Sequence, residues 1–337
     1  MNNYVEKVTA SVKEAKEKIK NLKTEDSLVF PIFTDLHTED VDHEYIKRLI
    51  PALELITEMV DYDAIINLGD NFSMLGRNIH ITNDELKARF ERVFSAIYDA
   101  TKHPMINANG NHDAIGTDFF KPDFWNSIVK GKYGNTFSVY GDEGSYYYID
   151  YEKANTRLIA LSLPYDSDLE SEMPTPLWGF GKSQLKWLEE TVLNTDKYVI
   201  ILSHVPFFYK YTGDMESTLG VWTGDEAKIS YVSALCGWIE DLDEAVAIID
   251  KFNNHTKRLI ACLSGHTHSD SLWLPREEKC GEKNPLPCHQ VVTTAACSTE
   301  NFELKIGISI DIAVWTPSKR ELHMIRIGDG EDRKILL

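Results

Sequence analysis

The sequence lacks any run of about 18 apolar residues, the length from which a membrane-spanning helix is recognised. Residues 1–23 also lack the apolar core of a secretory signal and carry charges throughout. We therefore expect a cytoplasmic protein that does not associate with a membrane.

Cysteine is scarce as well. The 337 residues include five cysteines, an odd number, and no two of them form a CxxC pair. A disulfide framework and the common cysteine-rich zinc sites are therefore not indicated. We expect reduced thiols, such as Cys262 within the apolar segment Ala261–Leu263. A bridge between Cys280 and Cys288, across the loop that separates them, is the alternative.

Basic residues are outnumbered by acidic ones. Lys and Arg total 35 against 53 Asp and Glu, which gives a net charge of −18. A surface of this sign repels nucleic acid, which requires a basic face, and also repels an anionic membrane. A small phosphate ester is not excluded, because bound metal ions can reverse the local charge. The sequence contains no internal repeat, low-complexity tract or flexible linker that would indicate an array of modules.

Apolar residues at three- and four-residue spacing indicate an amphipathic helix within residues 1–25. Its apolar face comprises Val5, Val8, Val12, Ala15, Ile19 and Leu22. We expect residues 26–337 to form a single domain that contains an aromatic-rich insert around residues 205–258.

Short apolar segments alternate with helical patterns in the first half of the chain, and strand patterns dominate the end. Strands are predicted at 28–33, 64–68, 105–108, 146–151, 157–163, 198–203, 259–263, 290–294, 306–314 and 322–327. Helices are predicted at 43–60 with a kink or break at Pro51, around 86–97 with a cap near Thr82 or Asn83, from Ser183 onward, and at 238–252. These patterns favour an α/β protein with mixed sheets, in which two sheets pack together and helices lie outside.

Polar side chains follow five of the predicted strands, at the point where each strand ends. They are Asp35, His37, Asp70, Asn111, His112, His204, His266 and His268. The carboxyl ends of neighbouring strands meet at one edge of a sheet, so these side chains are expected to lie close together. Carboxylate, imidazole and amide groups without a thiolate suit divalent Mn, Fe or Zn. Eight candidates exceed the needs of one ion but fit two ions, if one carboxylate bridges them.

Each of these motifs has an ordinary structural explanation when it is taken alone. Gly69-Asp70 is a common turn, Gly110-Asn111-His112-Asp113 could be a turn closed by a local side-chain bond, and His204 could be a buried histidine. The pair His266 and His268 is the most specific motif, because two histidines two residues apart in a turn can reach one metal centre. The order of the motifs, each at a strand end, favours the metal site.

This ordered set of motifs resembles the calcineurin-like metallophosphoesterases, and it spans residues 35–268. Residues 183–188 also resemble a helix of the phosphodiesterase-type branch. The resemblance implies a four-layer αββα sandwich of two mixed β-sheets flanked by helices, with two divalent metal ions at the strand ends. It implies that one ion is held by Asp35, His37 and His268, that the other is held by Asn111, His204 and His266, and that Asp70 bridges the two.

The resemblance also implies a mechanism. A hydroxide that bridges the metals would attack phosphorus in line, His112 would act as general acid, and Asp113 would orient the loop. The second motif continues as Asn71-Phe72-Ser73 and lacks the further Asp and Arg of the protein serine/threonine phosphatases. The resemblance therefore favours a small phosphate monoester or diester, such as a nucleotide, as the substrate.

Two questions remain open at this point. The aromatic residues Phe207, Phe208, Tyr209, Tyr211 and Trp222 would either form a wall beside the metals or pack the insert onto the domain. A non-catalytic metal-binding scaffold on the same fold is the first alternative to the hydrolase, and a nuclease is the second. The complete set of ligand residues argues against the scaffold, and the acidic charge argues against the nuclease.

Overall fold

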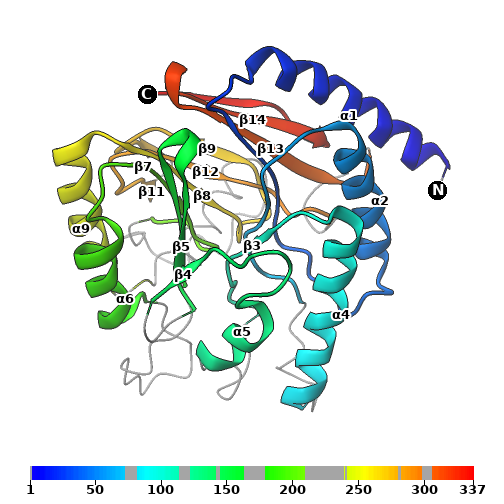
Figure 1. Ribbon diagram of the computed structural model, residues 1–337, viewed down its shortest axis with the longest axis horizontal. Coiled ribbons are helices and arrows are strands. Elements are labelled where there is room, and N and C mark those ends of the chain that lie inside the picture. Colours follow the sequence, from blue (N-terminus) through cyan, green and yellow to red (C-terminus); the bar gives the residue numbers. More distant parts are fainter. Residues whose placement is uncertain are drawn as a thin grey trace.

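The computed structural model describes residues 2–72, 82–113, 122–141, 145–162, 179–208, 239, 241–279, 282–297 and 306–337. Within these residues, two mixed β-sheets pack face to face and helices cover the outer face of each sheet (Figure 1). Helices α1 (Asn2–Leu22), α2 (Glu44–Met59) and α4 (Asn83–Thr101) lie against one sheet, and α6 (Gly181–Trp187) and α9 (Leu242–Thr256) lie against the other. This is the expected four-layer αββα sandwich.

The first sheet has the strand order β15-β14-β13-β1-β2-β3. Its strands are β1 (Leu28–Phe33), β2 (Ile65–Asn67), β3 (Met105–Asn107), β13 (Ser309–Thr316), β14 (Glu321–Gly328) and β15 (Arg333–Leu336). β1, β2 and β3 run parallel, whereas β13 pairs antiparallel with β1 and begins an antiparallel segment that continues through β15.

The second sheet has the order β4-β5-β6-β7-β8-β12-β9. Its strands are β4 (Val139–Tyr140), β5 (Tyr147–Tyr151), β6 (Thr156–Ala160), β7 (Tyr198–Leu202), β8 (Leu259–Ser264), β9 (Ser271–Trp273) and β12 (His289–Val292). The predicted hairpin is the antiparallel pair β5 and β6, and β6, β7, β8 and β12 run parallel. A separate two-stranded ribbon joins β10 (Glu278–Lys279) and β11 (Glu282–Lys283).

The helices lie on both sides of this pair of sheets. They are α1 (Asn2–Leu22), α2 (Glu44–Met59), α4 (Asn83–Thr101), α5 (Pro122–Val129), α6 (Gly181–Trp187), the π-helical turn η2 (Leu188–Val192) and α9 (Leu242–Thr256). Two short 3₁₀ turns, η1 (Glu152–Ala154) and η3 (Pro317–Lys319), connect strands. None of the helices in this described part of the chain combines the length and apolar character needed to cross a membrane.

Alternation along β1 shows how one strand supplies two layers of core. Leu28, Phe30 and Ile32 point between the sheets, whereas Val29 and Phe33 point toward the helices. All six positions of β1 are buried, as expected for a central strand covered on both faces. An apolar strand of this kind fixes the position of the polar residues that follow it.

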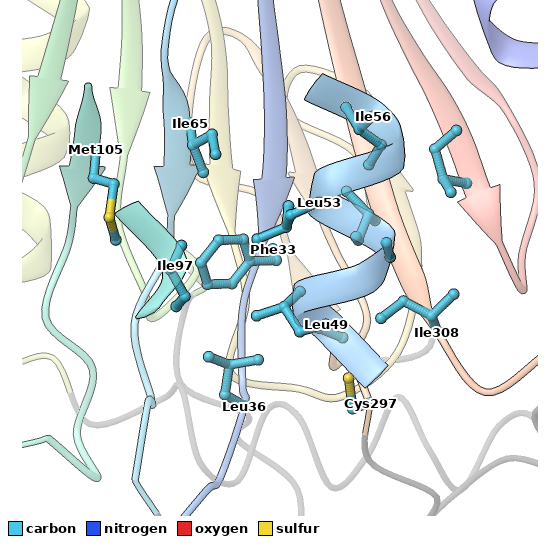
Figure 2. Packing of buried hydrophobic residues seen from close by; sticks show 14 of the residues in the cluster. Phe33, Leu36, Leu49, Leu53, Ile56, Ile65, Ile97, Met105, Cys297 and Ile308 are labelled. Atoms are coloured by element: carbon cyan, nitrogen blue, oxygen red, sulfur yellow. The ribbon is translucent and has the colours of Figure 1, made fainter. Parts of the chain in front are cut away.

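Helix α2 packs on the outer face of the first sheet, with Leu49, Leu53 and Ile56 over Phe33 (Figure 2). The helix is continuous through Pro51, so the break considered at that residue does not occur. Proline removes only one backbone donor, and the buried apolar face on either side of it keeps the helix in place.

Helix α1 buries the face that its spacing predicts. Val8, Val12, Ala15 and Ile19 belong to the same core as α2. Two polar contacts add to this packing. The Tyr4 hydroxyl donates to the Arg48 carbonyl at 2.7 Å, and the Gly328 amide donates to Ser11 Oγ at 3.0 Å. The described contacts therefore dock α1 onto α2 and β14.

Two helix starts differ from the prediction. α6 begins at Gly181, not with a cap by Ser183, because the carboxylate of Asp241 accepts bonds from the Phe180 and Gly181 amides. The prediction began the last long helix at Trp238, whereas α9 begins at Leu242. Trp238 itself and most of the expected insert lie outside the described residues. Cys288 is a free, buried thiol, so the alternative bridge to Cys280 is not formed.

Candidate metal centre

The five predicted motifs meet at one edge of the sandwich. Residues 35–37 follow β1, Asp70 follows β2, and residues 110–113 follow β3, all at the carboxyl ends of parallel strands. In the second sheet, His204 follows β7 and residues 266–268 follow β8. The two sheets therefore contribute their strand ends to a common site, as α/β proteins with parallel strands do.

Asp35, His37 and His268 form one group whose ligand atoms lie within 4.8 Å of one another. His37 Nε2 and His268 Nε2 are 2.8 Å apart, and Asp35 Oδ1 is 3.3 Å from His268 Nε2 and 3.7 Å from His37 Nε2. Two ligands bound at right angles to one ion, each at about 2.1 Å, would be about 3 Å apart. These spacings fit a single ion.

Asp70, His204 and His266 form a second group within the same distance limit. Asp70 Oδ2 lies 3.1 Å from His204 Nε2 and 3.9 Å from His37 Nε2, so this carboxylate faces both groups. The two groups are also adjacent, because His204 Nε2 lies 3.9 Å from Asp35 Oδ1. The arrangement fits two neighbouring ions with Asp70 between them.

Unsatisfied polar atoms provide a test of whether these residues suit metal ions. Asp35 Oδ1, Asn111 Oδ1 and His204 Nε2 are buried without a hydrogen-bond partner. Buried polar atoms are almost always hydrogen-bonded, so three such atoms at one site call for another partner. Oxygen and imidazole nitrogen are suitable donors for a divalent ion.

The other atoms of these side chains are held by the protein. Asp35 Oδ2 accepts from Thr34 Oγ1 at 2.8 Å and from the His266 amide at 2.9 Å. His204 Nδ1 lies 2.9 Å from the Leu68 carbonyl, which can only accept, so Nδ1 carries a proton. In the neutral ring, Nε2 then keeps the lone pair that a metal ligand needs.

Two glycines allow these groups to approach one another. A Cβ on Gly265 would lie 2.1 Å from Thr34 Oγ1 and 2.6 Å from Asp35 Oδ2. A Cβ on Gly110 would lie 2.1 Å from Asp70 Oδ1. The motifs therefore require glycine because a side chain would occupy the space of the carboxylates.

The backbone at the site is also unusual. Asp35, His37, Asp70, His266 and His268 all have positive φ, between 42° and 71°. This left-handed region is sparsely populated by residues other than glycine, and such conformations concentrate at functional sites. The sharp turns direct the side chains of consecutive motif residues toward one point.

The buried carboxylates of the site are stabilised by nearby positive charge. Burial alone would raise the pKa of Asp35, but the imidazoles of His268 and His204 lower it well below its ordinary value. Burial would lower the pKa of His204, but Asp70 and Asp35 raise it to about 9. Burial and the charge of His204 lower the pKa of His266 to about 3, which keeps that ring neutral. A proton on His204 thus offsets part of the charge of the two buried carboxylates, a task that cations can also perform.

His112 lies beside these two groups, and its ring forms a further set with His37 and Asp70 within the same distance limit. Its Nε2 is 3.8 Å from Asp70 Oδ2, and its ring meets that of His37 edge to face at 4.6 Å. Burial and the neighbouring His37 lower its pKa, whereas Asp70 raises it. Its side chain is 20% exposed, whereas that of His204 is fully buried. His112 is therefore partly exposed to solvent.

Asp113 is buried below the turn. It accepts from the Gly110 amide at 3.0 Å, from the Asn71 amide at 2.8 Å and from Asn71 Nδ2 at 3.1 Å. Burial and the nearby Asp70 raise its pKa to about 6. These bonds connect the turn after β3 to the turn after β2.

Sequence reasoning missed part of this support. Asn67 Nδ2 donates to Asn71 Oδ1 at 2.7 Å and to Asn107 Oδ1 at 3.2 Å, beneath the site. The sequence signal was available, because asparagine ends both apolar strands, β2 and β3. A buried amide at a strand end requires a partner, and here the partners are one another.

The described aromatic residues near the expected insert are packed. Phe207 stacks on Phe180 with ring centroids 5.2 Å apart, and Phe208 packs on Trp273 at 4.8 Å. All four are buried. For these residues the packing explanation holds, whereas Tyr209, Tyr211 and Trp222 lie outside the described residues.

Comparisons with solved structures agree with this architecture. A dimetal phosphatase from Danio rerio matches with a TM-score of 0.59 at 15% identity, over 92% of this chain and 98% of that one. PhoD matches with a TM-score of 0.54 at 12% identity, over 92% of this chain and 68% of that one. At these identities the similarity establishes the fold alone.

The sequence comparisons give a family. No curated protein matches the sequence. The profile of the calcineurin-like phosphoesterases matches residues 29–270, more than two thirds of the chain and all five motifs. Together with the sandwich and its cluster of histidines and aspartates, this match shows that the chain belongs to the calcineurin-like phosphoesterase family and is a hydrolase of phosphate esters.

Proposed function

We propose that the protein binds two divalent metal ions and hydrolyses small phosphate esters. The observation that carries this proposal is that three buried atoms at the strand ends, Asp35 Oδ1, Asn111 Oδ1 and His204 Nε2, form no hydrogen bond. Ordinary packing does not account for three such atoms at one place, whereas metal coordination does.

The proposed ligands divide between the two ions. Asp35, His37 and His268 hold the first ion. The second is held by Asn111, His204 and His266, with Asp70 shared between the two. Manganese, iron and zinc all suit this set of oxygen and nitrogen donors.

Metal ions bound here would lower the pKa of a nearby water and neutralise the charge of the phosphate oxygens. The protein's own residues then perform three tasks. Asp70 holds the two ligand groups together, and Asp113 fixes the turn that carries Asn111 and His112. In the in-line displacement that we propose, His112 donates a proton to the leaving oxygen, because its ring lies beside Asp70 and is partly exposed to solvent.

The substrate that we propose is a small phosphate monoester or diester, such as a nucleotide. The net charge of −18 disfavours a nucleic acid as substrate, since phosphate backbones bind basic surfaces. The structural neighbour from Danio rerio is named a dimetal phosphatase, which is consistent with a two-metal phosphoesterase. We place the reaction in the cytoplasm.

The test is hydrolysis of p-nitrophenyl phosphate and of its bis-ester by metal-stripped protein, before and after Mn²⁺ is added. Asp70→Asn is expected to lose both metal binding and turnover. His112→Ala is expected to retain metal but to lower kcat by about 10²- to 10⁴-fold, the usual contribution of a general acid. His255→Ala, an exposed histidine of α9, is the matched control and should behave as the wild type.

The result also separates the hydrolase from the non-catalytic scaffold. Two bound metals without turnover of either ester would favour the scaffold. Retention of metal by Asp70→Asn would contradict the proposed ligand set. A complete set of seven donors around one point favours the hydrolase.

A further inference from the structure

Two arginines and two aspartates form a cluster behind the metal centre. Arg326 Nε donates to Asp311 Oδ1 at 3.0 Å, and Arg326 Nη2 donates to Asp270 Oδ1 at 2.6 Å. Arg333 also contacts both aspartates, with Nη1 3.3 Å from Asp270 Oδ1 and Nη2 bonded to Asp311 Oδ2. The two positive and two negative charges balance. We call these four residues the arginine cluster.

The arginine cluster is largely removed from solvent. The side chain of Asp311 is fully buried and that of Arg326 is 2% exposed, whereas that of Asp270 is 28% exposed. The arginines come from β14 and β15, and Asp311 comes from β13, so all three belong to the first sheet. Asp270 follows the turn of the second sheet that carries His266 and His268. The cluster therefore connects the two sheets near the proposed ligands.

A short chain of hydrogen bonds leads from this cluster to one proposed ligand. Asp270 Oδ1 accepts from the Thr294 amide at 3.1 Å, and Thr294 Oγ1 donates to the His268 carbonyl at 2.7 Å. His268 itself has a positive φ of 53°, a backbone conformation that its surroundings must hold in place. Thr294 therefore bonds His268 directly, and Asp270 holds Thr294.

We propose that Asp270, anchored by Arg326 and supported by Thr294, is a positioning residue for the metal ligand His268. The inference rests on the proposed metal centre. Arg326, Arg333 and Asp311 lie beyond residue 270, where the family match ends, whereas Asp270 is the last residue that the match covers. Groups that orient metal ligands typically change metal affinity by about 10- to 100-fold when they are removed.

The test is calorimetric titration of metal-free protein with Mn²⁺, together with the visible spectrum of the Co²⁺-loaded protein. In Asp270→Asn, affinity for one of the two ions is expected to fall by about 10- to 100-fold while the other is held nearly as before. The selective loss arises because His268 belongs to only one group of ligands. Thr294→Val, which deletes the hydroxyl that holds the His268 carbonyl, is expected to produce a smaller loss at the same ion. Both variants should alter the Co²⁺ spectrum, which reports ligand geometry.

Two control variants separate positioning from folding. Asp150→Asn breaks a comparable pair, because Arg157 Nε and Nη2 donate to Asp150 at 2.7 and 2.8 Å and the Asp150 side chain is 25% exposed. Thr101→Val removes a buried hydroxyl that donates to the Ile97 carbonyl at 3.0 Å, on a helix that ends before β3 begins. Both controls should lower the melting temperature of the metal-free protein about as much as Asp270→Asn and Thr294→Val do. Neither control should change the affinity of either Mn²⁺ site.

The outcomes are distinct. Equal Mn²⁺ affinities and identical Co²⁺ spectra in wild type, Asp270→Asn and Thr294→Val would overturn the positioning role while leaving the metal centre intact. An equal loss of affinity for both Mn²⁺ ions in Asp270→Asn and in Asp150→Asn would also overturn the positioning role, because general destabilisation of the protein would then explain the loss. A wild type that binds no pair of ions would refute the proposed function and the positioning role with it.

Discussion

Gly110 offers the sharpest test of the metal centre, because replacing it with alanine adds one methyl group beside Asp70. The added Cβ would lie 2.1 Å from Asp70 Oδ1 and 2.3 Å from the Asp70 amide nitrogen. Heavy-atom contacts below 3.0 Å essentially never occur at real Cβ atoms, so the two turns would have to separate by about 1 Å. Neither turn moves freely, since Asp113 bonds to the Gly110 amide in one and to the Asn71 amide in the other.

The size of this displacement determines the expected effect. Metal–ligand distances tolerate about ±0.2 Å, so a shift of about 1 Å at Asp70 should remove it from at least one ion. A misplacement of this size is expected to lower turnover by about 10²-fold or more. The added strain should reduce the free energy of unfolding by about 1–3 kcal/mol, which leaves a folded protein to measure.

Calorimetry with Mn²⁺ and hydrolysis of p-nitrophenyl phosphate would measure the effect of Gly110→Ala. Gly131→Ala is the control, because that glycine has a φ of 70° and no atom within 4 Å of the added Cβ. It should lose about 1–2 kcal/mol of stability through backbone strain alone and keep both metal affinities. If Gly110→Ala retained wild-type metal affinity and turnover, Asp70 would not be the shared ligand.

Three further predictions concern the body of the protein. Burial would raise the pKa of Asp311, but Arg326 and Arg333 lower it. The Asp311 carboxylate therefore stabilises the folded protein above the ordinary carboxyl pKa of about 4, and this stabilisation is lost as pH falls through the lowered pKa. Urea unfolding should therefore find Asp311→Asn about 3–5 kcal/mol less stable than wild type at pH 7, and a difference that did not shrink at pH 3 would contradict this account. Burial raises the pKa of Cys262 and of Cys297 to about 12, and Cys288 is also buried. An aromatic disulfide reagent at pH 8 should therefore react with no more than two of the five thiols before denaturant is added. Ile19→Ala should cost about 2–5 kcal/mol of unfolding free energy with Mn²⁺ affinity unchanged, and a neutral effect would show that α1 is not part of the core.

The central architecture could be predicted because it depends on local patterns. Strands such as β1 and β8 are uninterrupted apolar segments that end in polar residues, so their position, their burial and the location of the site followed from the sequence. The apolar spacing of α1 and the threonine cap of α4 were equally local signals. The four-layer arrangement came from the family resemblance and is confirmed.

What the sequence did not reveal depends on contacts between distant segments. Asp241 caps α6 from 60 residues away, so no pattern near Ser183 could place the helix start. Asp270 and Arg326 are 56 residues apart, and each looks like an ordinary surface charge in the sequence. Pro51 remains inside α2 because tertiary packing outweighs the loss of one backbone hydrogen bond.

The left-handed backbone at five proposed ligands has a consequence for how such a site persists. Each of these positions would suit glycine better than aspartate or histidine, at a difference of about 1 kcal/mol per residue. Selection for stability alone would therefore replace the donors with glycine and relax the turns. In the proposed metal centre, the presence of all five side chains reflects a requirement for the donor atoms rather than for the turns that carry them.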